Sequence, residues 1–269
     1  AIGGNNCGPA FGRLSELLSI NSTLTALDVH GNDIGDVGCS ELAKGLEIGS
    51  GDRPSEILVD VLADPVVCAL SGPTIAAELI QRLPALMVAA CSAKDVSART
   101  HRAFGTGWLR IYESEDLLGV ELAGAVKNVI ALAAGVCDGL DLGSNAKSAL
   151  LARGLAEMTR FGLSLGAHSN TFFGIAGVGD LATTCFSPEG RNRSCGEAIA
   201  RGATLSEYLE EQQCVVEGVP TVKSVLRTAA EHAVEMPIAE MVGRIFFDGL
   251  DPRKAIQELM ARPSADEGL

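Results

Sequence analysis

The longest apolar stretch of the chain covers residues 117–137 and contains only two charged side chains, Glu121 and Lys127. Its length alone would be enough to cross a bilayer. Each charge near the middle of a spanning helix would cost about 2.5–3.5 kcal/mol on an insertion scale, and no second span follows. We therefore predict a helix at about 115–137 that is buried inside a soluble domain.

Between residues 54 and 114 the pattern changes to short apolar segments separated by helical ones. Strands are predicted at 65–70, 84–91 and 108–112, and helices at 74–82 and 94–104. This alternation is typical of a parallel or mixed sheet with helices packed on it.

After Ser114 the helical periodicity dominates, and Ser114, Thr204 and Asp251 are suitable N-cap residues. The second half of the chain is therefore predicted to be all-helical. Its further helices are expected at about 145–166, 177–184, 193–201, 204–211, 217–232, 237–247 and 251–260.

The first fifty residues repeat their own pattern at an offset of 28 positions, so that Leu14 matches Leu42 and Ile20 matches Ile48. Between the copies lies LTALDVHGNDIG, and the whole resembles a leucine-rich repeat of a strand followed by a helix. Such repeats bury their faces only against neighbours, and roughly three or more are needed. Residues 1–50 are thus expected to be a poor domain by themselves.

The composition of the chain excludes some classes of partner and ligand. The 21 basic and 34 acidic residues give a net charge of −13, which argues against nucleic acid or an anionic membrane as the main partner. Eight cysteines are scattered singly without metal-site spacing, which favours reduced thiols in the cytoplasm and no bound metal. The first residues lack a signal-peptide pattern and begin with Ala, so we interpret the chain as a fragment.

Lys127 is the first candidate for chemistry, because burial disfavours a charged ammonium and suits it to exchange protons. Small residues lie one turn away on its face, at Gly124 and Ala131, so a ligand can approach, and Asn128 adds a neutral donor and acceptor. The alternative is a lysine that snorkels at the edge of a packed helix.

A second candidate is the segment GVGDLATTC at 177–185, in which Asp180 follows two glycines and the hydroxyl of Thr184 follows one turn later. Asp180 could hold a lysine or a substrate hydroxyl. Gly177, Gly179 and Ala182 also fit a dinucleotide fingerprint, which we reject because no strand precedes them.

The third candidate is Arg191-Asn192-Arg193, which is expected at the start of a helix. It is either an anion-binding site or an exposed basic loop.

Long segments of the chain resemble NAD(P)-dependent glycerol-3-phosphate dehydrogenase from about residue 44 to 262. The similarity is carried, in order, by SGPTIAAEL (71–79), GVELAGAVKNVIALAAGVCDGLDLGSNAKSAL (119–150), RGLAEMTRFGLSLGA (153–167), GVGDLATTC (177–185), RNR (191–193), VVEGVPT (215–221) and MPI (236–238). The resemblance implies an α/β plus all-α fold. A partial Rossmann-type sheet at 51–114 is expected to precede a helical 6-phosphogluconate-dehydrogenase-like domain at 115–269 that binds substrate and forms a homodimer.

The resemblance also implies roles for single residues. Lys127 would exchange a proton with the C2 oxygen of dihydroxyacetone phosphate or glycerol 3-phosphate as hydride passes to or from NAD or NADP, and Asp180 would support it. The expected substrate-binding residues are Lys44, Thr74, Asn128, Thr184, Arg191 and Asn192, and the expected cofactor-binding residues are Gly72, Ala76, Arg191, Val215 and Glu217.

Residues 1–43 contain no strand followed by the GxGxxG turn that would bind a cofactor pyrophosphate. A half sheet would leave an edge strand unpaired and its apolar face uncovered. Three interpretations follow: an enzyme that makes the precursor of glycerophospholipids, a non-catalytic interaction protein, and a truncated, inactive fragment of that enzyme.

Overall fold

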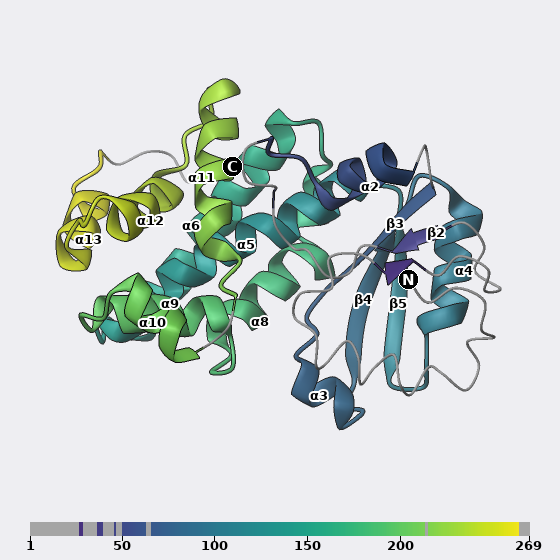
Figure 1. Ribbon diagram of the computed structural model, residues 1–269, viewed down its shortest axis with the longest axis horizontal. Coiled ribbons are helices and arrows are strands. Elements are labelled where there is room, and N and C mark those ends of the chain that lie inside the picture. Colours follow the sequence, from purple (N-terminus) through teal and green to yellow (C-terminus); the bar gives the residue numbers. More distant parts are fainter. Residues whose placement is uncertain are drawn as a thin grey trace.

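The computed structural model describes residues 27–28, 37–39, 46, 50–62, 66–212 and 215–263. A mixed β-sheet forms one side of this part of the molecule and a body of helices the other, with helix α5 (Leu117–Gly139) running from the sheet into the helical body (Figure 1). The fold class expected from the sequence is confirmed. The leucine-rich-repeat interpretation of residues 1–50 falls mostly outside the described residues.

The sheet has the order β1-β2-β3-β4-β5 and mixes parallel with antiparallel pairs. Parallel pairs join β2 to β3 and β4 to β5, whereas β1–β2 and β3–β4 are antiparallel. The unpaired edge expected for the half sheet is wrong, because β2 pairs with β3. The strands are β1 (Leu27–Asp28), β2 (Val37–Cys39), β3 (Val66–Ser71), β4 (Ala85–Ala90) and β5 (Leu109–Ser114).

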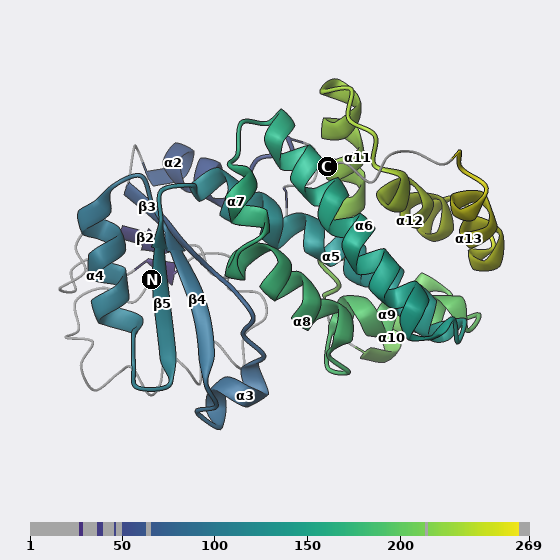
Figure 2. The same ribbon diagram turned by 180° about the vertical axis from the view of Figure 1, so that it is seen from behind.

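Alternation along the strands places two different cores on the two faces of the sheet. Cys68, Leu70 and Met87 pack with Val96 of helix α4 (Lys94–Phe104), which covers one face. The other face, with Ala69, Val88 and Ala90, packs on Val120 of α5. Figure 2 shows α4 on the outside of the sheet. The face expected to be uncovered is therefore covered by α5.

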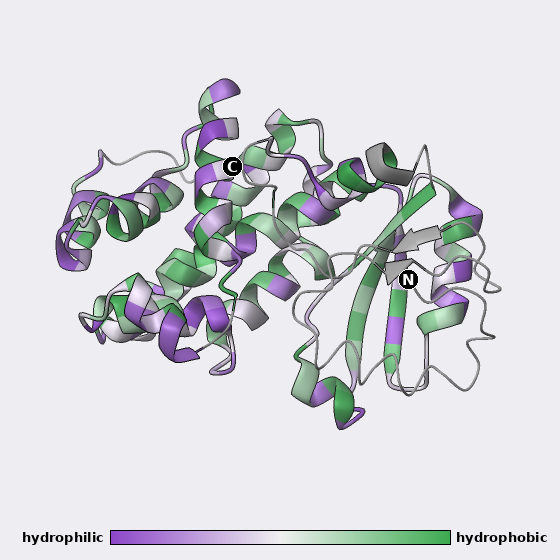
Figure 3. Ribbon diagram, in the orientation of Figure 1, coloured by the Kyte–Doolittle hydropathy of each residue, from purple (hydrophilic) through white to green (hydrophobic). Residues whose placement is uncertain are grey.

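Helix α5 is the centre of the helical body and is apolar along most of its length (Figure 3). It is long and apolar enough to cross a membrane, but 83% of its most apolar window is buried inside the protein. The helices around it are α6 (Gly143–Ser164), α7 (Ser169–Phe172), α8 (Asp180–Phe186), α9 (Arg191–Ala200), α10 (Leu205–Gln212), α11 (Gly218–Glu231), α12 (Pro237–Phe247) and α13 (Pro252–Met260).

Two glycines allow α5 and α9 to cross with their backbones in contact. A Cβ atom added to Gly135 would overlap the carbonyl oxygen of Arg193, and one added to Gly196 would overlap that of Leu132. Only glycine lets two helices approach so closely. The crossing brings the first residues of α9 beside the middle of α5.

Helix caps confirm part of the sequence interpretation. Thr204 and Glu207 form a reciprocal capping box at α10, and Asp251 accepts two backbone N–H groups at α13. At α5 the prediction is off by two residues, because Asp116 is the N-cap and Ser114 instead accepts the backbone N–H of Asp116.

Helix α2 (Pro54–Leu62) lies in a stretch read as short strands, so its helical structure was not predicted. Its first turn is fixed to α5 by a buried carboxylate. Glu121 accepts hydrogen bonds from the backbone N–H and the hydroxyl of Ser55, at 2.8 and 2.5 Å, and from the guanidinium of Arg53 at 2.7 Å. The polar break at Glu121 in the apolar helix thus joins the helical body to the segment that leads into β3.

Candidate active site

The predicted lysine and carboxylate meet at the centre of the helical body. The Nζ atom of Lys127 lies 2.5 Å from Oδ1 of Asp180, and both side chains are almost fully buried, at 7% and 3% exposure. Lys127 also donates a hydrogen bond to the Thr184 hydroxyl at 3.0 Å. A snorkelling lysine is therefore excluded, and the ammonium is held at a fixed position by two groups from α8.

Asp180 reaches this position through a short π-helical turn, η1 (Ile175–Gly179), that runs directly into α8. Turns of this kind are frequent at functional sites. Gly177 is required because a Cβ there would overlap the backbone of Phe172. Helix α7, not a strand, precedes the turn. The rejection of a dinucleotide fingerprint at these glycines is confirmed, since no strand precedes them and packing accounts for Gly177.

The hydroxyl of Thr184 has its own orientation fixed. It donates to the backbone carbonyl of Asp180 at 2.7 Å, one turn earlier in α8. Its oxygen is therefore left to accept from Lys127. The carboxylate and this oxygen together fix the position of the lysine Nζ atom by pairing and hydrogen bonding.

Next to Lys127, Asn128 belongs to a buried relay of amides. The backbone N–H of Gly218 donates to Oδ1 of Asn192 at 2.9 Å, and Nδ2 of Asn192 donates to Oδ1 of Asn128 at 3.1 Å. Because a backbone N–H can only donate, it fixes the orientation of both side-chain amides. Asn128 consequently turns its oxygen toward Asn192.

Arg191 begins α9, as predicted, and its guanidinium lies 2.9 Å from the carboxylate of Glu217, just before α11. Both groups are partly exposed, which leaves the guanidinium accessible to an anion at a helix N-terminus. Arg193 points elsewhere, since it pairs with Asp138 at 2.6 Å and with Glu197 at 2.9 Å. Of the two arginines, only Arg191 suits the predicted anion site.

The remaining predicted residues lie on other segments than the lysine cluster. Thr74 is half-buried and donates to the carbonyl of Gly72, Ala76 is exposed at the start of α3 (Ala76–Ile80), and Val215 is exposed before α11. Gly72 follows β3, and a Cβ there would come close to the backbone of β4 and to Ile175 of η1. Lys44 lies outside the described residues.

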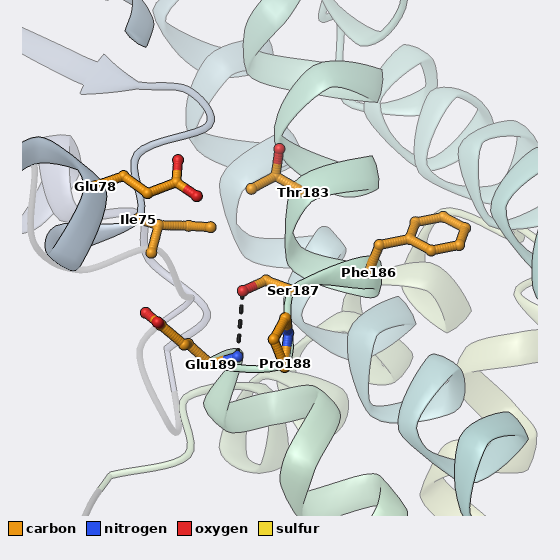
Figure 4. Close-up of a pocket in the computed structure, with 7 residues that line it drawn as sticks. All are labelled: Ile75, Glu78, Thr183, Phe186, Ser187, Pro188 and Glu189. Atoms are coloured by element: carbon orange, nitrogen blue, oxygen red, sulfur yellow. Dashed lines mark hydrogen bonds between the residues drawn. The ribbon is translucent and has the colours of Figure 1, made fainter. Parts of the chain in front are cut away.

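A hollow of about 260 Å³ opens beside these groups, between α3 and the connection from α8 to α9 (Figure 4). Glu78 faces Thr183 across it, and the hydroxyl of Ser187 accepts the backbone N–H of Glu189 at 3.2 Å. With two carboxylates in its lining it is a poor place for a phosphate. Arg191 is therefore a better candidate for the anion site than this hollow.

Ser71, at the carboxyl end of β3, is a residue that the sequence did not single out. Its hydroxyl is buried and has no hydrogen-bond partner among the described residues. Buried polar atoms are nearly always paired, so one left alone needs an explanation. Ligands of open α/β sheets bind at the carboxyl ends of strands, where this hydroxyl lies.

The sheet packs on the helix that carries a buried lysine–carboxylate pair, and an arginine stands at a nearby helix start; such an arrangement is typical of an oxidoreductase of the nucleotide-dependent class. Residues 27–97 match the model of the NAD-dependent glycerol-3-phosphate dehydrogenase N-terminus, and residues 116–257 match that of its C-terminus.

Among curated proteins, the chain is 45% identical to the glycerol-3-phosphate dehydrogenase [NAD(P)+] of Citrifermentans bemidjiense over 230 residues, which are 84% of this chain and 69% of that protein. It is 45% identical over 228 residues to the corresponding protein of Streptomyces griseus, with 84% and 68% covered. The crystal structure of glycerol-3-phosphate dehydrogenase from Coxiella burnetii superposes with a TM-score of 0.80 at 34% identity, covering 94% of this chain and 74% of that one. The chain belongs to the NAD-dependent glycerol-3-phosphate dehydrogenase family.

Proposed function

We propose that this chain transfers hydride between NAD(P)H and dihydroxyacetone phosphate, with Lys127 as the group that gives or takes the accompanying proton. The observation that carries the proposal is the buried contact of Lys127 with Asp180 and Thr184. An ammonium held in a dry site by a carboxylate is a positioned acid for a carbonyl oxygen that gains negative charge.

The described residues fit a nicotinamide cofactor at the strand ends. The unpaired hydroxyl of Ser71 offers a hydrogen bond there, and the positive φ of Gly72 turns the chain away from β3 without a Cβ. Arg191 and Glu217 pair with each other at the starts of α9 and α11 in the helical body. When bound, the cofactor supplies or accepts the hydride at C2 of the substrate.

Side chains of this protein are assigned to proton transfer, to orientation of the ammonium and to substrate binding. Lys127 donates a proton to the C2 oxygen in the reducing direction and takes it back in the oxidising direction. Asp180 keeps the ammonium oriented and charged between turnovers, and Thr184 fixes its second hydrogen bond. Asn128 lies next to Lys127 on α5 and contributes a side-chain amide, oriented by Asn192, to the binding of a substrate oxygen.

The phosphate of the substrate is assigned to Arg191 and the N-terminus of α9. The guanidinium can form two parallel hydrogen bonds to phosphate oxygens, and the free backbone N–H groups of the first turn favour an anion. Phosphate binding would take Arg191 away from Glu217, to which it is paired in the described structure.

The test is oxidation of NADH or NADPH, followed by absorbance, with dihydroxyacetone phosphate added to the purified chain and to Lys127→Met. The chain should consume cofactor in proportion to the phosphate ester, and the variant should lose at least about a hundredfold in kcat. Calorimetric titration with NADH separates this reading from a non-catalytic interaction protein. Absence of both turnover and saturable NADH binding would refute the proposal.

We further propose that the protein is a homodimer that associates through its helical body, as the resemblance implies. Several large apolar side chains of this body are exposed, among them Leu163 on α6 and Phe173 after α7. Light scattering should give twice the chain mass of 27.8 kDa. A mass of one chain at micromolar concentration would count against the dimer.

A further inference from the structure

Cys68 on β3 lies opposite Cys91, the residue that follows the neighbouring strand β4. The antiparallel register pairs Ala69 with Ala90, so the next pair outward is Cys68 with Cys91. Opposite residues of an antiparallel pair point to the same face and have Cα atoms about 4.5–5.5 Å apart. That separation falls within the roughly 4.4–6.8 Å range of disulfide-bonded cysteines.

The surroundings of both thiols agree with this register. Cys68 and Cys91 belong to the same buried cluster on the α4 face of the sheet, and both are fully covered. Neither forms a disulfide in the described structure. No residue of the proposed active site belongs to this cluster, so the pair is not explained by the dehydrogenase reaction.

Cys91 is in addition placed to form a thiolate. Its Sγ atom accepts the backbone N–H of Ala93 at 3.4 Å, and Ala93 is the N-cap of the eleven-residue helix α4. A helix N-terminus stabilises a thiolate, as it does in known reactive cysteines. A hydrogen bond from Cys68 lowers the pKa of Cys91 to about 7, although burial and the nearby Asp95 act in the opposite direction.

Two other buried thiols of the chain provide an internal comparison. Burial raises the pKa of Cys137 to about 11 and that of Cys185 to about 12. Neither has a neighbour that stabilises its thiolate enough to offset the burial. At neutral pH they are expected to remain unreactive thiols.

We propose that Cys68 and Cys91 form a redox-modification site that a peroxide converts into a cross-strand disulfide. The Cys91 thiolate attacks one peroxide oxygen, the O–O bond breaks, and Cys91 becomes a sulfenic acid while hydroxide leaves. Cys68 then attacks the sulfenic sulfur, the S–S bond forms, and water leaves with the Cys68 proton. In total two thiols are oxidised by two electrons and one peroxide is reduced to two waters.

The experiment treats the full native chain with hydrogen peroxide, blocks remaining thiols with an alkylating reagent, and identifies linked peptides by mass spectrometry. The expected product is a peptide pair joined through Cys68 and Cys91, two hydrogens lighter than the reduced pair. Alkylation of these two cysteines should be lost together and at least about tenfold faster than that of Cys185. Linkage that appears only after denaturation would overturn the proposal.

Single cysteine substitutions test which two thiols form the disulfide. Cys91→Ser should abolish the linkage, and Cys68→Ser should leave Cys91 as a sulfenic acid that a diketone probe captures. Cys39 of β2 is in register with Cys68 on its other side, so Cys39→Ser serves as the matched control and should leave the linkage unchanged. A Cys39–Cys68 linkage in the unsubstituted chain would refute the pairing. Circular dichroism of each variant shows whether the fold is retained.

Discussion

Glu121 on the central helix holds Ser55 by both its backbone N–H and its hydroxyl, so one buried carboxylate fixes the first turn of α2. Burial raises the pKa of Glu121 and outweighs the opposing hydrogen bonds and the charge of Arg53. The hydrogen bonds of this carboxyl group therefore matter more for stability than its charge.

We accordingly expect Glu121→Gln to cost less than Glu121→Ala. Glutamine retains an acceptor for Ser55 and should lower the free energy of unfolding by about 1 kcal/mol, whereas alanine leaves Ser55 unpaired and should cost roughly 2–3 kcal/mol. Urea unfolding measures both. Glu56→Gln, which changes only an exposed partner of Arg53, is the control and should be nearly neutral. Equal losses for the two Glu121 variants would contradict the argument.

Asp180→Asn should show how much activity depends on the positioning of Lys127, because the lysine itself is retained. The amide occupies the same volume but removes the negative charge 2.5 Å from the ammonium. We expect kcat to fall by about 10²–10³, with a much smaller change in the KM for dihydroxyacetone phosphate. Thr183→Val, on the same helix but with its hydroxyl bonded to the backbone carbonyl of Gly179, is the control. A variant of Asp180 that only raises KM would assign this carboxylate to substrate binding.

Ser71→Ala should weaken cofactor binding without weakening the fold. The hydroxyl of Ser71 is buried and unpaired among the described residues, so its removal should leave the free energy of unfolding unchanged or raise it by about 1 kcal/mol. The dissociation constant of NADH should rise several-fold if this hydroxyl meets the cofactor. A destabilised variant with normal NADH affinity would show that the hydroxyl serves the fold.

Stability should fall with rising pH because of Glu157. Its carboxylate accepts the backbone N–H groups of Ile238 and Ala239, yet burial raises the pKa of Glu157 from 4.5 to about 7. The folded protein therefore holds a proton that the unfolded chain releases between about pH 4.5 and 7, so the free energy of unfolding decreases across this window.

The size of this effect is roughly 3 kcal/mol at about 1.4 kcal/mol per pKa unit. The measurement is urea unfolding from pH 4.5 to 8 for the protein and Glu157→Gln. The difference between the two curves isolates this carboxyl group from all others. Parallel curves would mean that Glu157 stays ionised throughout.

Gly135→Ala should disturb the crossing of α5 and α9. The added methyl group overlaps the backbone of Arg193, which cannot move without separating the helices. We expect a loss of at least roughly 2–3 kcal/mol of stability, together with reduced kcat, because Asn192 on α9 would shift relative to Asn128. Gly107→Ala, in open space before β5, is the matched control. Thermal unfolding and kinetics are compared for the two variants.

The elements of this fold could be read from sequence where one periodicity dominates. The unbroken apolar run predicted α5, and the capping residues Thr204 and Asp251 marked the starts of α10 and α13. Helix α2 was missed because its nine residues, PSEILVDVL, are too short for helical periodicity to exceed an apolar strand pattern. The turn η1 was missed because a π-helical hydrogen-bond pattern has no distinct signature in residue order.

The site could be predicted residue by residue but not as a set of contacts. A lysine in an apolar helix can be recognised from sequence as a candidate, because burying its charge costs free energy that a function would explain. That its partner is Asp180 depends on how α8 packs against α5, which no local pattern encodes. The partner of Glu121 and the opposition of Cys68 to Cys91 were hidden for the same reason, because they follow from the docking of α2 and from strand register.

The amine that we propose to react lies on α5, a helix that is buried along most of its length, and not on a surface loop. Substitutions along α5 can therefore abolish activity in two ways. Some loosen the packing of the helix, and others change the groups that take part in the reaction. A mutational scan that measures only growth or turnover would not distinguish destabilised variants from chemically altered ones. It would therefore assign too many residues to the active site. Only variants sorted beforehand by their melting behaviour would outline the few positions that handle protons.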